Sequence, residues 1–263
     1  MQLLLETWRF RYFILGAVKR EFQVRYTNAI LGGLWAIAQP LALIVVYTVV
    51  FSQVMRMKLP GMPDAFAFSI YLCAGVLTWG YFSEVVSRLL LVFTDNAQWL
   101  KKLRFPKQSL ILIVVLSASL NFAVIFSLFI GFLILTNHFP GWPFLAVFPL
   151  IALQMLLSIG LGLTLAIVHV FFRDVGQFMV IVLQFWFWLT PIVYPIAALP
   201  EYAQQIIALN PMTPLMGAYQ DILVHGRVPN WIKLLPLLLT SFALIVCALY
   251  LYRQHATDIL DEI

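Results

Sequence analysis

Long apolar stretches separated by short polar segments dominate the chain. Six stretches contain about 20 residues or more, the length that an α-helix needs to cross a bilayer core roughly 30 Å thick. Backbone groups cannot stay unpaired in lipid, and the short alternating segments typical of membrane barrels do not occur, so the pattern predicts helices. The predicted transmembrane helices are residues 31–55, 66–93, 109–136, 143–172, 175–194 and 232–252.

Residues 1–28 show a different periodicity. Apolar residues recur at steps of three and four, as in an amphipathic helix, and the basic residues lie mostly off that stripe. Such a helix suits the interface between membrane and water, and an ordinary basic leader is the alternative. The apolar stripe consists of Leu4, Trp8, Tyr12, Leu15, Val18 and Phe22.

A short helix is predicted at residues 95–105. Asp95 can cap its N-terminus, and Pro106 disfavours helix in the residue before it. The segment carries apolar residues for a partner surface and basic residues near its C-terminus, although a simple basic turn would have a similar composition. These residues are Trp99, Leu100, Leu103, Lys101, Lys102 and Arg104.

The connection at residues 196–230 is too apolar for an ordinary loop. Pro200 can start a helix that Asn210-Pro211 stops, and a second helix can then run as far as Gly226. Two short apolar helices in this position predict a hairpin that re-enters the membrane.

Composition and charge agree with a membrane protein. Hydrophobic residues make up 63% of the chain and charged residues 10%, with a mean hydropathy of +0.95, which leaves too little polar surface for a water-soluble globule. Lysine and arginine gather in the segments on one side of the predicted membrane, so both termini are expected in the cytoplasm. The net charge of +5 follows from this bias and gives no reason to expect nucleic acid.

The segment from residue 172 to residue 195 carries the candidate transport chemistry. Arg173-Asp174 marks a tight turn before the fifth predicted span, where Asp174 can cap the helix. The far end of that span is rich in rings and broken by proline. Aromatic rings pack on the apolar faces of sugars, but they also form the interfacial belt of ordinary membrane proteins. The residues concerned are Phe185, Trp186, Trp188, Thr190, Pro191, Tyr194 and Pro195.

Other features allow simpler interpretations. Glu84 and Arg88 are four residues apart in the second span and can pair. Ser158, Gly162 and Ala166 form a smooth helix face for packing, either within the chain or between two copies. The cysteines and histidines are scattered and make no metal cluster, and no phosphate-binding loop of an ATPase occurs. A secondary transporter or an intramembrane enzyme is a weaker alternative, because the spans contain few ionisable groups.

Several short motifs along the chain carry a resemblance to a known family. They are Arg20-Glu21, Arg25-Tyr26, Leu31-Gly32-Gly33-Leu34-Trp35, Pro40, Phe172-Arg173-Asp174, Thr190-Pro191-Ile192-Val193-Tyr194 and Asn210-Pro211. With these motifs the chain resembles, over nearly its whole length, the membrane subunits of ATP-binding-cassette polysaccharide exporters of the type 2 permease superfamily. Within that group it is most similar to exporters of O-antigen lipopolysaccharide, followed by those of capsule and teichoic acid.

The resemblance implies a homodimer in the bacterial inner membrane, joined to two copies of a cytosolic ATPase that bind ATP and magnesium. This chain would bind no cofactor or metal and would export an undecaprenyl-diphosphate-linked polysaccharide, or a drug or small lipid in other members of the superfamily. Residues 95–105 would couple to the ATPase, and Arg20 and Arg25 would attract the lipid diphosphate. Trp35 would line the channel with the fifth span. Residues 196–230 would form a periplasmic gate that includes Asn210 and Pro211, together with Thr190, Pro191 and Pro195 at the end of the fifth span.

Overall fold

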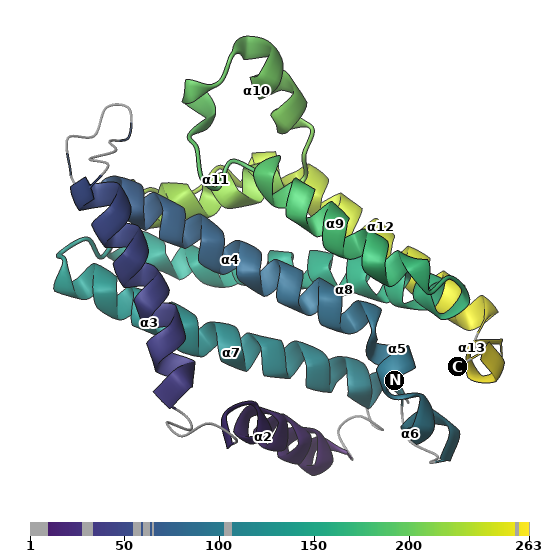
Figure 1. The fold of residues 1–263 in the computed structure, drawn as a ribbon. Helices are drawn as coiled ribbons and strands as arrows, with labels where there is room; N and C mark the ends of the chain where they lie inside the picture. The colour runs from purple at the N-terminus through teal and green to yellow at the C-terminus, as the bar shows by residue number, and fades with distance from the viewer. Residues whose placement is uncertain are drawn as a thin grey trace.

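The computed structural model describes residues 10–27, 34–54, 59, 64, 66–102, 107–255 and 258–262, and it is all-α within these ranges. This confirms the prediction that the chain is helical. The helices are arranged as one bundle of long helices with shorter helices at its periphery (Figure 1). In chain order they are α2 Arg11–Thr27, α3 Trp35–Tyr47, the π-helix η2 Thr48–Val54, α4 Ala67–Leu90, α5 Val92–Asp95, α6 Ala97–Lys102, α7 Lys107–Leu135, η3 Trp142–Ala146, α8 Val147–Phe171, α9 Asp174–Trp188, η4 Ile196–Ala198, α10 Glu201–Ala208, α11 Met212–Leu223, η5 Trp231–Leu234, α12 Leu235–Gln254 and α13 Asp258–Glu262.

α4 is the central helix of the bundle. It contacts α3, α7, α8, α9 and α11, so it is buried on most sides, whereas α12 packs on the outer side of α8. Large side chains of α4 such as Tyr81, Phe82 and Leu89 are almost fully buried. An apolar helix surrounded by other helices needs no polar face, which explains why hydrophobic residues cover nearly its whole circumference.

Small residues let the helices approach closely. A Cβ atom at Gly162 of α8 would lie 2.7 Å from Leu89 Cβ of α4, and one at Gly160 would lie 2.9 Å from Leu244 Cβ of α12. Ser158, Gly162 and Ala166 are all buried within the chain. The predicted smooth stripe is therefore a packing face inside one subunit. Small residues suit such a face, because van der Waals contact rather than hydrophobic burial drives helix association in lipid.

Among the residues that the structure describes, four segments are long and apolar enough to cross a membrane: Ala67–Leu90, Ser109–Leu135, Trp142–Phe171 and Trp231–Gln254. The first and fifth predicted spans correspond to shorter apolar helices, Ile37–Ser52 and Asp174–Trp188. The prediction that the fifth span continues as a helix to residue 194 is wrong, because α9 ends at Trp188, just before Thr190-Pro191. At about 1.5 Å per residue, α9 is roughly 22 Å long and shorter than a bilayer core.

The bundle has two ends. α6 and the α8–α9 turn lie at one, called the α6 end here, and the predicted hairpin lies at the other, called the hairpin end (Figure 1). α11 packs against α4 and α8 inside the bundle, whereas α10 stands away from it. The two helices thus occupy the predicted region but differ in surroundings.

Candidate substrate pathway

Two of the predicted pathway rings lie on the outside of α9. Phe185 is 65% exposed and Trp188 is 58% exposed in the single chain. Rings on the surface of an apolar helix can contact lipid, a second subunit or a sugar. Phe185 and Trp188 are therefore available for a pathway that two copies would form together.

Trp186 has a different environment. Its ring packs edge-on against Trp79 and Phe82 of α4, with centroids 6.1 and 5.4 Å apart. Its indole Nε1 donates at 2.8 Å to Oδ1 of Asn210, which lies between α10 and α11 of the hairpin. Trp186 thus joins α9 to α4 and to the hairpin.

Asn210 is the polar centre of the hairpin end. Besides accepting from Trp186, its Oδ1 accepts from the Met212 backbone N at 3.0 Å, and its Nδ2 donates to Thr190 Oγ1 at 2.9 Å and to Leu189 O at 3.1 Å. The predicted stop at Asn210-Pro211 is observed between α10 and α11. The same amide that interrupts the hairpin helices also fixes the end of α9.

Further hydrogen bonds satisfy the backbone beyond α9. The Pro191 carbonyl accepts from Gln220 Nε2 at 2.9 Å, and the Tyr71 hydroxyl lies 3.0 Å from it and 2.9 Å from the Tyr194 carbonyl. The Tyr194 hydroxyl donates to the Trp188 carbonyl at 2.7 Å. These bonds meet the requirement that a backbone break inside a membrane protein be paired with protein.

Thr190, Pro191 and Pro195 lie at this break. Thr190 is fully buried, and its Oγ1 donates to the Trp186 carbonyl at 2.7 Å. Pro191 is buried and Pro195 is half-buried. The segment predicted as a gate is held rigidly to α4 and α11 in this conformation.

Arg173 and Asp174 form the turn between α8 and α9, and both side chains are exposed. Asp174 was expected to cap α9, but Arg173 occupies the N-cap position and no side-chain cap bond is made. Asp174 is instead the first residue of the helix, where its charge still faces the positive end of the helix dipole.

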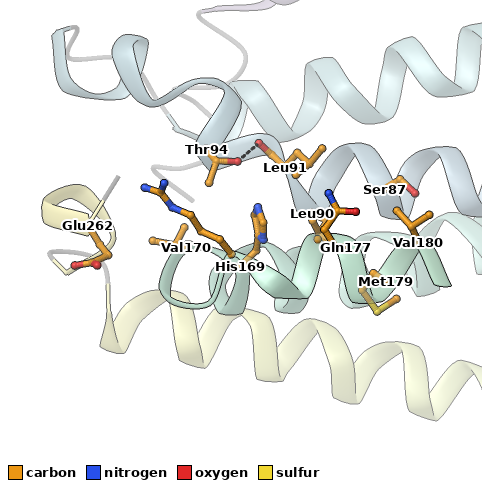
Figure 2. Close-up of a pocket in the computed structure, with 12 residues that line it drawn as sticks. Ser87, Leu90, Leu91, Thr94, His169, Val170, Gln177, Met179, Val180 and Glu262 are labelled. Atoms are coloured by element: carbon orange, nitrogen blue, oxygen red, sulfur yellow. Dashed lines mark hydrogen bonds between the residues drawn. The ribbon is translucent and has the colours of Figure 1, made fainter. Parts of the chain in front are cut away.

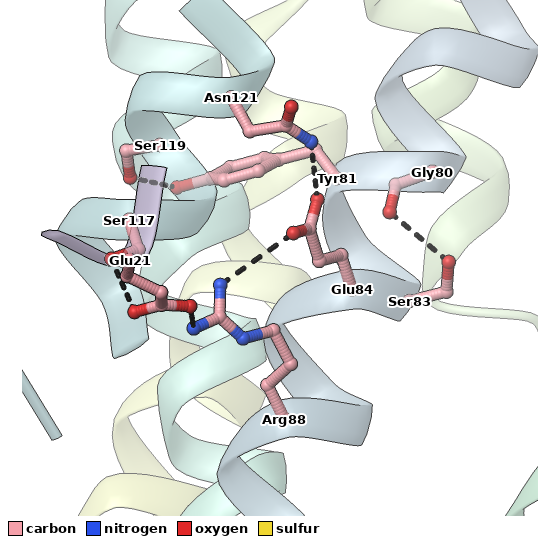
Figure 3. A network of polar contacts seen from close by, with 9 residues as sticks. All are labelled: Glu21, Gly80, Tyr81, Ser83, Glu84, Arg88, Ser117, Ser119 and Asn121. Atoms are coloured by element: carbon pink, nitrogen blue, oxygen red, sulfur yellow. Dashed lines mark hydrogen bonds and ion pairs between the residues drawn. The ribbon is translucent and has the colours of Figure 1, made fainter. Parts of the chain in front are cut away.

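An ionic network joins three helices near the α6 end (Figure 3). Arg88 Nη1 lies 3.6 Å from Glu84 Oε1, which confirms the predicted pair, and Arg88 Nη2 also contacts Glu21 of α2. Glu21 Oε2 accepts from Ser117 at 2.8 Å, and Glu84 Oε2 accepts from Asn121 at 2.8 Å. Two carboxylates thus share one guanidinium, and the network ties α2 to α4 and α7.

A cavity of about 800 Å³ lies between α3, α4 and α7, beside this network. Trp35 lines it and is 46% exposed. A second cavity of about 380 Å³ lies between α2 and α7, and Arg20, an exposed residue, lines it. The Arg25 side chain lies outside the described part of the chain. The structure therefore places Trp35 and Arg20 at separate cavities.

The predicted coupling segment divides into two short helices. The expectation that Asp95 caps it is wrong, because Asp95 is the last residue of α5 and α6 begins at Ala97. Leu100 was expected on an exposed apolar face, but it is buried against Phe93 and Ile259. Lys101 is exposed. Residues 103–106, with Leu103 and Arg104, and the side chains of Trp99 and Lys102 lie outside the described part.

Sequence reasoning missed several of these polar residues. Glu21 stands among the basic residues of α2, and Asn121 and Gln220 each place a polar side chain in an apolar helix. Such residues are costly in lipid unless paired, so their isolation was the signal that each has a partner inside the bundle.

Comparison with known proteins identifies the family. A model of the ABC-2 type transporter family matches residues 13–224, which is most of the chain. The chain belongs to the ABC-2 type transporter family. It is therefore the membrane-embedded part of an ATP-binding-cassette transporter, which works with an ATPase.

Individual relatives of the ABC-2 family cover the chain almost completely. The O-antigen export system permease protein RfbA of Myxococcus xanthus is 29% identical over 266 residues, covering 100% of both chains. The protein of the same name from Klebsiella pneumoniae is 28% identical, covering 89% of this chain and 88% of its own. The polysialic acid transport protein KpsM of Escherichia coli is 23% identical, covering 92% of this chain and 93% of its own.

Proposed function

We propose that this chain is the channel-forming subunit of an exporter that moves an undecaprenyl-diphosphate-linked O-antigen polysaccharide from cytoplasm to periplasm. The observation that carries the proposal is the full-length similarity to O-antigen export permeases of two bacteria. The exposed rings of α9 support it, because a glycan needs apolar stacking surfaces as well as hydrogen bonds.

In this proposal two copies form a homodimer in the inner membrane, and two cytosolic ATPase subunits bind at the α6 end. ATP and magnesium belong to the ATPase, and this chain supplies the pathway. Phe185, Trp188 and Tyr194 contact the moving glycan, and Trp35 lines the pathway from α3. Trp186, which the sequence also assigns to the channel, positions α9 through its contacts with α4 and Asn210.

Six spans and a re-entrant hairpin complete the proposed topology, with both termini in the cytoplasm. α9 is shorter than a bilayer core, and α11 is buried among α4 and α8. The turn after Trp188 and the hairpin of α10 and α11 therefore finish the crossing that α9 begins. Since the break is paired by Asn210, Tyr71 and Gln220, it can lie at membrane depth without unpaired backbone.

Coupling is proposed to run through α6, with Trp99 and the exposed Lys101 against the ATPase and Leu100 anchoring α6 to the bundle. Lys102, Leu103 and Arg104 would extend that contact. Arg20 and Arg25 would attract the diphosphate of the lipid from α2, close to the network of Glu21 and Arg88.

The test is copurification of this chain with its partner ATPase, followed by mass spectrometry of bound lipid. The proposal expects a complex of two permease and two ATPase chains with an undecaprenyl-diphosphate glycan. A capsular polysaccharide is the second candidate cargo, favoured by the similarity to the polysialic acid transport protein. A complex that carries only drug-like molecules or small lipids would overturn both cargo assignments.

A further inference from the structure

A pocket of about 550 Å³ lies at the α6 end, outside the contacts described so far (Figure 2). Its wall is formed by the end of α4, by α5, by the last turn of α8, by the first turns of α9 and by α13. The volume is within the roughly 300–1,000 Å³ of ligand pockets.

His169 is the most unusual residue of the pocket. It is only 7% exposed, and its Nδ1 is buried without a hydrogen-bond partner among the described residues. Its ring lies against the backbone of Gly176, where a Cβ atom would come within 2.9 Å of His169 Cε1. A buried polar nitrogen without a partner is uncommon in proteins and indicates a missing ligand.

Arg173 adds a fixed positive charge beside this imidazole. It lines the pocket at the N-cap of α9, and no ion pair or side-chain hydrogen bond holds its guanidinium to any residue that the structure describes. A guanidinium can bind a phosphate through two parallel hydrogen bonds. The start of α9 also favours an anion through its helix dipole.

Neutral donors and an apolar wall complete the lining. Ser87 and Gln177 carry a hydroxyl and an amide group that can donate to phosphate oxygens, whereas the Thr94 hydroxyl already donates to the Leu91 carbonyl at 3.1 Å. Leu90 and Met179 line the same pocket and can cover the first carbons of a lipid chain. The combination suits a ligand with a phosphate at one end and hydrocarbon at the other.

We propose that this pocket binds the phosphate-bearing headgroup of a membrane lipid, with Arg173 and His169 on the phosphate. The inference rests on the proposed function for its place at the cytoplasmic surface, where the diphosphate of the lipid-linked glycan would arrive. Among the described residues of the lining, Glu262 of α13 is the one carboxylate, and it opposes an anion until α13 moves or the carboxylate turns away.

The test measures binding without ATP, so it does not depend on export. The complete transporter in nanodiscs is titrated with three probes: a labelled polyprenyl diphosphate, labelled phosphatidylglycerol and inorganic pyrophosphate. Losing a charge-assisted hydrogen bond weakens binding roughly tenfold or more, which is the effect expected for Arg173→Gln. Arg253→Gln, at an exposed position of α12 on the same end, is the matched control and binds as the wild type does.

Two further variants, Gly176→Ala and Glu262→Gln, separate a role in lipid binding from a structural role. Gly176→Ala forces the His169 ring to move and weakens binding, whereas Gly131→Ala meets open space and changes nothing. Glu262→Gln removes the opposing charge and tightens binding.

Tight polyprenyl diphosphate binding that Arg173→Gln and Gly176→Ala both weaken supports a headgroup site for the cargo. Equal binding of phosphatidylglycerol supports a general lipid site. Wild-type affinity in both variants, weaker binding in Glu262→Gln, or pyrophosphate that binds as tightly as the lipids would overturn the proposal. None of these outcomes bears on whether the transporter exports a glycan.

Discussion

Asn210 connects the end of α9 to the hairpin, so its replacement tests the rigidity of that junction most sharply. Asn210→Ala removes two accepted hydrogen bonds, from Trp186 Nε1 and Met212 N, and two donated ones, to Thr190 Oγ1 and Leu189 O. At about 1 kcal/mol net for each bond, and less for the exposed bond to Leu189, the loss is about 2–4 kcal/mol.

Thermal unfolding of the purified chain in nanodiscs, followed by tryptophan fluorescence, measures this loss. The matched control is Asn230→Ala, which removes one exposed bond from the Ile232 backbone N at 3.1 Å and is expected to cost about 1 kcal/mol or less. An Asn210→Ala variant that melts at the same temperature as Asn230→Ala would refute the view that this amide fixes the junction.

A double-mutant cycle isolates the bond between α9 and the hairpin. Trp186→Phe keeps an aromatic ring near Trp79 and Phe82 but removes the Nε1 donor. Combined with Asn210→Ala, it should give a coupling energy of about 1 kcal/mol, because each single variant already breaks the shared bond. Additive losses would show that the 2.8 Å contact does not contribute to stability.

Three other predictions concern packing, charge and coupling. Gly162→Ala pushes a methyl group against Leu89 and should destabilise the chain by about 1–3 kcal/mol in the same melting assay, whereas Gly131→Ala should not; equal melting would refute the close contact. Arg88→Gln leaves two carboxylates uncompensated and should lower the free energy of unfolding by roughly 1–3 kcal/mol, which is less than for fully buried pairs. Unchanged stability would contradict this prediction. Trp99→Asp should separate ATP hydrolysis from export, and normal export with a normally bound ATPase would remove Trp99 from the coupling surface.

The helices and the family could be predicted from the sequence because their signals are local. Apolar length indicates a membrane helix wherever it occurs, and Asn210-Pro211 stops a helix through its own chemistry. The sequence predicted a fifth helix that is too long, because residues 189–194 are as apolar as the helix before them. Only the hydrogen bonds of Tyr71 and Gln220, more than 25 residues away in the chain, make the early stop visible.

The candidate site was harder to predict because side-chain direction is set by tertiary packing. Trp186 and Trp188 are two residues apart in the same aromatic run. Trp186 is nevertheless hydrogen-bonded to Asn210, whereas Trp188 is exposed. Leu100 belongs to a segment that looked amphipathic, but Phe93 and Ile259 surround it. The partner of Arg88 on α2 could not be found from spacing, because Glu21 precedes it by 67 residues.

The central claim is that this chain forms an ATP-driven pathway for a lipid-linked polysaccharide. The most direct measurement reconstitutes the chain with its ATPase in proteoliposomes that contain an undecaprenyl-diphosphate glycan, and it follows the protection of the glycan from an added glycosidase. The proposed function predicts that ATP moves the glycan across the bilayer and that Phe185→Ala with Trp188→Ala slows the movement without changing ATPase binding. Movement at the same rate without ATP hydrolysis, or no movement of glycan in a fully assembled complex, would contradict it.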